Sequence, residues 1–171
     1  MQKKRFRRRV FRSFKQVWKN HTFPFKNMDK VRHAMRGGLV SFAFRERLMM
    51  VVSEVNGCRY CIYYHAKESI KVGLSEVEMR SMLQGNVSDA PADEIPALLY
   101  AQHWAETDGH PDTDTREKIV ARYGKERTDA IETVLHLIRL GNLWGNSWDY
   151  FLYRLTFGLH GTTEMDELIV S

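Results

Sequence analysis

Hydrophobic residues fill one segment of the chain almost without interruption. Residues 40–55, VSFAFRERLMMVVSEV, carry charges at only four positions, and this pattern predicts a long buried helix. Asn56 and Gly57 then interrupt it. A second helix is expected over about residues 58–72, closed by Gly73 as the glycine that follows a helix.

Helical spacing continues through the rest of the chain. Ser75 and Glu78 have the spacing of a capping box, which opens a third helix. The segment 85–96 is the longest loop, and Asp93 is the candidate cap of the helix that follows. No segment combines strict alternation with enrichment in β-branched residues, so the sequence predicts an all-α domain of about seven or eight helices. The later helices are expected at about residues 97–106, 114–123, 126–143 and 144–155.

The N-terminal segment is the most basic part of the chain. Its apolar residues recur at three- and four-residue steps, so residues 4–19 are expected to form a helix with one apolar stripe, and Pro24 ends the segment. Up to Lys19 it carries nine Lys or Arg and no acid, which leaves the remainder with a net charge of −4. We therefore divide the chain into a basic amphipathic extension, residues 1–25, and a helical domain, residues 26–171.

The extension leaves several partners open. It can pack on its own domain, on a partner subunit or on an anionic surface, so contact with a membrane or nucleic acid through residues 1–19 is a further hypothesis. The remaining body gives no sign of a nucleic-acid-binding surface.

Composition narrows the class of protein. With 43% hydrophobic residues in 171, the chain can bury the core of one domain. No apolar run approaches the roughly 20 residues of a membrane span, and the basic start lacks the apolar core of a secretory signal. Two cysteines are too few for a disulfide-stapled secreted scaffold. We therefore expect a cytoplasmic protein.

The stretch GCRYCIYYHAKE, residues 57–68, holds the side chains best suited to chemistry. On a helix, Cys58, Cys61 and His65 share one face, and the helix N-terminus favours a thiolate in the first turn. Two cysteines at this spacing can close a disulfide without moving the backbone, and a nearby imidazole can take the thiol proton. A redox pair is the leading interpretation.

Two other interpretations of the cysteines stay open. Two thiolates and one imidazole supply three zinc ligands, so His21, His33 or Glu46 would have to complete a structural site. Alternatively, the cysteines are buried thiols without chemistry. We expect neither a metal nor another cofactor.

The segment FRERLMMVVSEVNGCRYCIYYHAKESIKVGLSEVEM resembles the signature of the AhpD-like family, which includes alkylhydroperoxidase D and the carboxymuconolactone decarboxylase-like proteins. The family pattern is E-x11-C-x2-C-x3-H. Four residues fill it without a gap: Glu46, Cys58, Cys61 and His65. The resemblance is strong over roughly residues 39–85, looser to about residue 157, and does not include residues 1–25.

The resemblance implies an all-helical homo-oligomer, a trimer or hexamer, with a cofactor-free thiol peroxidase or disulfide reductase site. It implies that Cys61 is the peroxidatic nucleophile, which attacks a hydroperoxide and becomes a sulfenic acid. Cys58 is then the more exposed resolving cysteine, which closes the disulfide and meets the reductant. That reductant is a lipoylated protein, a thioredoxin-like protein or a small thiol. His65 and Glu46 form the proton relay that activates Cys61.

Two positions of this relay can be judged from the residues themselves. A carboxylate at Glu46 inside an apolar helix is costly unless it is paired, and a histidine is a suitable partner. The alternative is that Glu46 bridges to Arg45, Arg47 or a surface charge. Where the characterised peroxidase has a relay histidine before the second cysteine, this chain has Tyr60, which can still donate a hydrogen bond.

The second half of the chain supplies further candidates. Asn142, Trp144, Asn146 and Trp148 fall where the family closes over its pocket, so they either line the pocket or pack the core or a subunit interface. The family's decarboxylases act on a lactone without a cysteine pair, which argues against that reaction here. An alternative function is a non-catalytic oligomeric redox switch or binding module that docks through its basic N-terminal helix.

Overall fold

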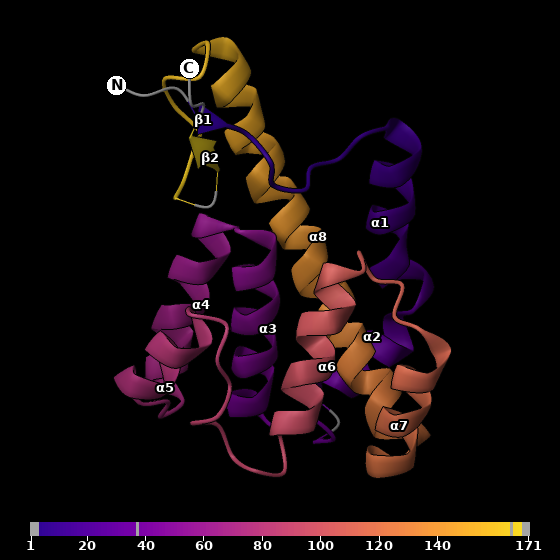
Figure 1. Ribbon diagram of the computed structural model, residues 1–171. Coiled ribbons are helices and arrows are strands. Elements are labelled where there is room, and N and C mark those ends of the chain that lie inside the picture. The colour runs from indigo at the N-terminus through magenta and orange to yellow at the C-terminus, as the bar shows by residue number, and fades with distance from the viewer. Residues whose placement is uncertain (1–3, 37, 165, 169–171) are drawn as a thin grey trace.

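Helix α3 (Phe42–Asn56) lies at the centre of the fold, as Figure 1 shows. Helices α4 (Arg59–Lys71), α6 (Ile95–Glu106) and α8 (Lys125–Leu155) pack around it. The computed structural model describes residues 4–36, 38–164 and 166–168, and within these residues the eight helices confirm the predicted all-α class. The others are α1 (Phe14–Lys26), α2 (Met28–Arg36), α5 (Glu76–Met82) and α7 (Thr113–Tyr123).

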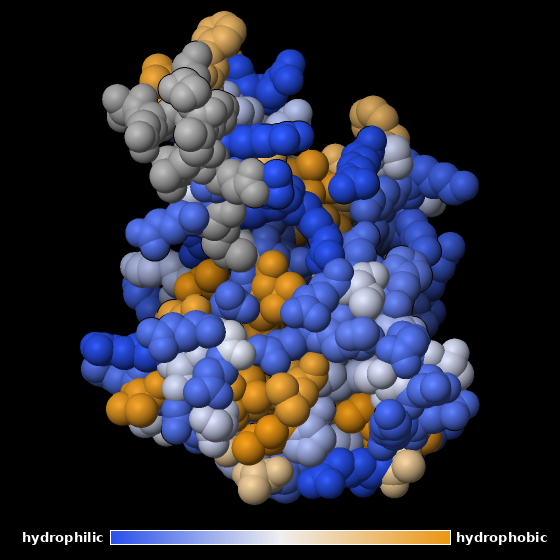
Figure 2. All heavy atoms as spheres, viewed as in Figure 1, coloured by the Kyte–Doolittle hydropathy of each residue, from blue (hydrophilic) through white to orange (hydrophobic). Residues whose placement is uncertain are grey.

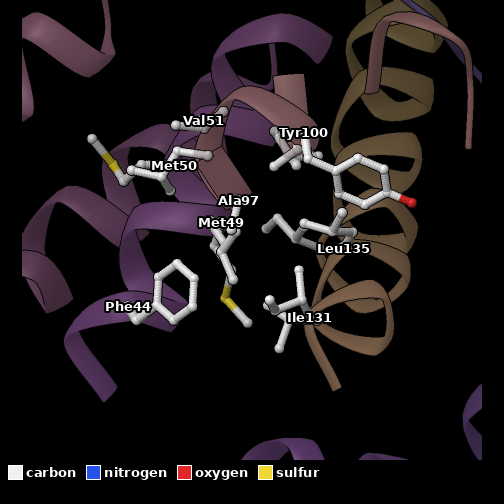
Figure 3. Close-up of a cluster of buried hydrophobic side chains, with 14 of the residues drawn as sticks. Phe44, Met49, Met50, Val51, Ala97, Tyr100, Ile131 and Leu135 are labelled. Atoms are coloured by element: carbon white, nitrogen blue, oxygen red, sulfur yellow. The ribbon is translucent and has the colours of Figure 1, made fainter. Parts of the chain in front are cut away.

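The hydrophobic core lies where α3, α6 and α8 meet. Figure 3 shows a cluster of buried hydrophobic side chains from the three helices. The labelled residues, all buried, are Phe44, Met49, Met50 and Val51 of α3, Ala97 and Tyr100 of α6, and Ile131 and Leu135 of α8.

On the face drawn in Figure 2, hydrophobic residues gather along the middle, over α3, and hydrophilic ones cover α1 and α7. Among the described residues, no helix has the length and apolar character needed to span a bilayer.

The break predicted near residue 143 is wrong, because α8 is one continuous helix from Lys125 to Leu155. Glycine and asparagine are local helix breakers, and a glycine in a helix interior costs about 1 kcal/mol relative to alanine. Here the same residues make tertiary contacts. The side chain of Asn142 donates to Ser53 Oγ (3.0 Å) and accepts from Asn56 Nδ2 (3.0 Å), both on α3.

The helix predicted over residues 4–19 is wrong over residues 4–13. Residues Lys4–Arg5 form strand β1, which pairs antiparallel with β2 (Glu167–Leu168), and α1 begins only at Phe14, after the N-cap Ser13. In extended backbone Phe6 and Arg8 lie on one face, and both reach α8: the Phe6 ring packs on Tyr150, and Arg8 pairs with Asp149.

Helix α1 also differs from its prediction at its end. It continues through Pro24 to Lys26, and α2 follows where no helix was predicted. The boundary drawn between residues 25 and 26 therefore falls inside α1, and the division into an extension and a domain stays a prediction.

Arg47, Glu78 and Glu94 form a buried ion-pair cluster, and two helix caps differ from their predictions because of it. Ser75 caps α5 as expected, because its Oγ accepts from the Glu78 N–H. The Glu78 carboxylate, however, binds Arg47 of α3 instead of returning to the cap. Arg47 also binds Glu94, which holds the N-cap position of α6 that was predicted for Asp93. Charge-assisted bonds in a buried site are stronger than a neutral cap, so the cluster determines where these side chains point.

His136 of α8 joins three helices through aromatic packing. Its ring lies 4.5 Å from the Phe23 ring of α1 and 4.9 Å from the Trp104 ring of α6, measured between centroids. Burial, with the nearby Arg139 cation, lowers the pKa of His136 to about 4.

We predict that this histidine makes stability depend on pH. The unfolded chain binds a proton at His136 near pH 6.5 and the folded chain only near pH 4, so the free energy of unfolding falls as the pH is lowered through this window. The expected loss is on the order of 3 kcal/mol. Urea denaturation from pH 7 to 4 measures it, and His136→Gln should flatten the dependence. An unchanged slope in His136→Gln would show that other groups cause it.

Candidate active site

The two cysteines lie at the junction between α3 and α4. Gly57 ends α3 with a φ of 66°, a left-handed conformation that favours glycine, and its N–H bonds back to the carbonyls of Glu54 and Ser53. Cys58 is the N-cap of α4, and its Sγ accepts from the Cys61 N–H at 3.4 Å. The break at Gly57 therefore places both sulfurs at the N-terminus of α4, where backbone N–H groups without a helical partner favour negative charge.

The two thiols are free and differ in acidity. A hydrogen bond from the Cys61 thiol lowers the pKa of Cys58, and the Cys61 and Tyr60 N–H groups and the Asn142 side chain act in the same direction, against the effect of burial. Donating that hydrogen bond raises the pKa of Cys61, and burial adds to the rise. The hydrogen bond between the sulfurs therefore favours a thiolate on Cys58, and Cys61 needs a neighbouring base to lose its proton.

The two thiols also differ in exposure to solvent, and Cys61, not Cys58, is the more exposed one. Cys58 is 0% exposed, whereas Cys61 is half-buried, so the prediction of a more exposed Cys58 is wrong. The cause is α8: a Cβ at Gly145 would lie 2.7 Å from Cys58 Sγ. Gly145 was not predicted as a site residue, although a glycine inside a helix next to Asn146 was a usable signal.

Cys61 borders a surface hollow of about 340 Å³, which we call the thiol hollow. Most of its wall is apolar or aromatic, and His65 is the one titratable imidazole among its described lining residues. The lining residues are Met35, Met49, Tyr60, Cys61, Tyr64, His65, Leu137, Ile138 and Gly141.

His65 and Glu46 are paired. Nδ1 of His65 lies 2.7 Å from Oε2 of Glu46, and both side chains are buried. The alternative pairing of Glu46 with an arginine does not occur, because Arg47 binds Glu78 and Glu94 while Arg45 bonds to the Met35 carbonyl. With Nδ1 engaged, Nε2 is the ring nitrogen left for a proton transfer on the hollow side.

Tyr60 does not join this pair through its hydroxyl. The hydroxyl donates to Asp149 Oδ1 at 2.8 Å, and Arg59 Nη2 binds the same oxygen at 2.6 Å. The ring still lines the thiol hollow. The structure thus directs Tyr60 toward α8, and Asp149 is a site neighbour that sequence reasoning missed.

None of the four candidates of the second half, Asn142, Trp144, Asn146 and Trp148, is among the described residues that line the thiol hollow. Asn142 and Asn146 are buried, and Asn146 Nδ2 donates to the Asn56 carbonyl at 2.7 Å. Trp144 donates to His21, and Trp148 is 55% exposed and stacks on a neighbouring ring of α8. The asparagines therefore fix α8 on α3, and the tryptophans face outward.

Metal ligation finds no support in this geometry. In the part of the chain that the structure describes, no three His, Cys, Asp or Glu side chains are grouped as a metal ion requires. Two of the suggested fourth ligands are engaged elsewhere, His21 with Trp144 and His33 with Glu126.

Comparison with known proteins finds a family match for one part of the chain. The model of the carboxymuconolactone decarboxylase family matches residues 25–107, which run from the end of α1 to the end of α6. No curated protein and no solved structure gives a significant match. The matched segment contains the cysteine pair and the Glu46–His65 pair, while α8 lies beyond it. Over residues 25–107, the chain is similar to the carboxymuconolactone decarboxylase family.

Proposed function

We propose that the protein is a thiol-dependent peroxidase of the alkylhydroperoxidase type, which can also act as a disulfide reductase. One observation carries the proposal: a cysteine pair and a carboxylate–histidine pair meet at the same hollow, because Cys61 and His65 both line it. A nucleophile next to an oriented base is the arrangement that thiol catalysis requires. Retention of both cysteines disfavours lactone decarboxylation.

The walls of the thiol hollow favour an organic hydroperoxide as substrate. Met35, Met49, Leu137 and Ile138 provide an apolar surface for an alkyl group. The peroxide oxygens would then lie on the side of Cys61.

In the first step His65 accepts the Cys61 thiol proton on Nε2, and Glu46 stabilises the imidazolium through Nδ1. The Cys61 thiolate attacks the terminal oxygen of the hydroperoxide, and the O–O bond breaks. The leaving alkoxide takes the proton that His65 received from Cys61. The products are an alcohol and a sulfenic acid on Cys61.

In the second step the Cys58 thiolate attacks the Cys61 sulfur and displaces hydroxide. The lowered pKa of Cys58 keeps it available as a thiolate, and a proton from solvent converts the displaced hydroxide to water. The pair has supplied two electrons, and the hydroperoxide has become alcohol and water.

The cycle needs an external thiol, which we assign to a thioredoxin-like or lipoylated protein or to a small thiol. A reducing compartment such as the cytoplasm keeps the pair reduced between turnovers. We also propose a homo-oligomer, a trimer or hexamer. Large apolar side chains exposed along α8 support it: Trp144, Trp148, Phe151 and Leu155.

Hydroperoxide consumption by variants tests the function. Cys61→Ser should abolish it, and His65→Gln or Glu46→Gln should lower the rate about 10²- to 10⁴-fold, because a positioned acid–base group is lost. The matched control is His103→Gln, a histidine that binds Asp112 away from the site and whose loss should leave the rate unchanged. A Cys61→Ser variant with the rate of the native protein would contradict the proposal.

A second candidate role is docking of the basic N-terminal segment on an anionic membrane surface. One observation favours it: α1 buries none of its residues, and Phe14 (94% exposed) and Trp18 (72%) project among Lys15 and Lys19. Exposed aromatic and cationic side chains on one short helix suit a lipid interface. A nucleic-acid contact of residues 1–19 stays a weaker hypothesis.

Vesicle sedimentation tests this role. Full-length protein should bind vesicles rich in phosphatidylserine at low salt at least about tenfold more tightly than neutral vesicles, because each cation contributes about 1 kcal/mol. The double variant Phe14→Ser, Trp18→Ser should lose most of the binding. Phe157→Ser, exposed elsewhere, is the control. Equal binding to neutral and anionic vesicles, or none, would exclude docking.

A further inference from the structure

Arg8 is a buried cation that joins both ends of the chain to α8. It is 8% exposed, and its guanidinium donates to Asp149 Oδ2 at 2.7 Å and to the Gly161 carbonyl at 2.6 Å. It also forms an ion pair with Asp166 Oδ2 at 3.1 Å. We call Arg8, Asp149 and Asp166 the Arg8 clamp. Figure 1 shows β1 and β2 side by side next to the C-terminal part of α8.

The clamp holds the backbone on both sides of Cys58. Nη1 of Arg8 donates to the Gly57 carbonyl at 3.3 Å, one residue before the cysteine. Oδ1 of Asp149 accepts from Arg59 and Tyr60, the two residues after it. Both carboxylate side chains of the clamp are 0% exposed. A buried ion pair with this many partners resists rearrangement, since breaking it leaves an unpaired charge in the interior.

Helix α8 closes the remaining side of Cys58. Gly145 of α8 lies against Cys58 Sγ, because a Cβ at this position would be only 2.7 Å from the sulfur. Cys58 is therefore enclosed by the clamped turn and by α8, whereas Cys61 borders the thiol hollow. A molecule arriving from solvent meets only one of the two sulfurs.

We propose that the Arg8 clamp seals Cys58, so that an external thiol reduces the Cys58–Cys61 disulfide by attacking Cys61. The proposal rests on the redox function above, and it assigns contact with the reductant to the cysteine opposite to the one implied by family resemblance. The clamp residues are positioning residues, because they act through the turn that holds Cys58.

The exchange balances with a dithiol reductant. Its thiolate attacks Cys61 Sγ, a mixed disulfide forms, the Cys58–Cys61 bond breaks, and the electron pair leaves on Cys58 as a thiolate. The second thiolate of the reductant then attacks the reductant sulfur that is bonded to Cys61, and the Cys61 thiolate is released. The reductant becomes the disulfide, and the protein the dithiol. The lowered pKa of Cys58 makes it the better leaving group.

Adduct mapping on the native protein tests the proposal without peroxidase turnover. Full-length protein is oxidised with diamide, exposed to excess 2-mercaptoethanol, quenched in acid and alkylated with N-ethylmaleimide. Trypsin cleaves after Arg59 and so separates the two cysteines into different peptides. At least about tenfold more mercaptoethanol adduct is expected on Cys61 than on Cys58, a factor that corresponds to 1.4 kcal/mol in the competing barriers. Equal adducts, or an excess on Cys58, would overturn the proposal.

Variants test the part played by the clamp. Arg8→Met and Asp166→Asn should raise the adduct on Cys58 to a share comparable with that on Cys61. Arg12→Met is the control, because Arg12 lies on the same segment with an exposed side chain. Circular dichroism checks that each variant keeps its helices. A folded Arg8→Met variant with the native adduct ratio would show that the clamp does not seal Cys58. Because diamide forms the disulfide, failure of the peroxidase proposal leaves this result interpretable.

Discussion

Helix α8 can approach the start of α4 closely because it presents glycine where it faces a cysteine sulfur. A side chain at Gly145 would collide with Cys58 Sγ, and close-packed interiors tolerate such a collision only by moving the neighbours. Asn142 and Asn146 complete the contact with hydrogen bonds to Asn56 at the end of α3. The positions of the sulfurs, and the difference between them, depend on this contact.

The contact gives two neighbouring thiols different properties. Cys58 is enclosed, yet hydrogen-bond donors compensate the burial of its charge, so its pKa is lowered. Cys61 keeps its proton and borders the hollow that also contains His65. One sulfur is placed to meet molecules from solvent and the other to react within the chain. The proposed disulfide cycle uses this division of roles.

Short-range patterns predicted much of this arrangement. Helical periodicity placed Cys58, Cys61 and His65 on one face of a helix, and the family resemblance added Glu46 as the partner of His65. The long-range contacts could not be predicted. Arg8 bonds to partners 141 and 158 residues away, and its basic neighbourhood resembled an amphipathic helix. Likewise, the exposure of Cys58 depends on α8, whose Gly and Asn residues resemble a helix break when tertiary contacts are unknown.

If Cys58 and Cys61 form a peroxide-reducing pair, as proposed, one equivalent of hydroperoxide consumes both thiols, and a thiol count measures this loss. Free thiols are counted on reduced, metal-free protein before and after one equivalent of cumene hydroperoxide. Both thiols of each chain should be lost together, and Cys58→Ser should instead accumulate a sulfenic acid on Cys61 that a dione reagent traps. Survival of both thiols in the native protein would show that the two cysteines do not form a peroxide-reducing pair.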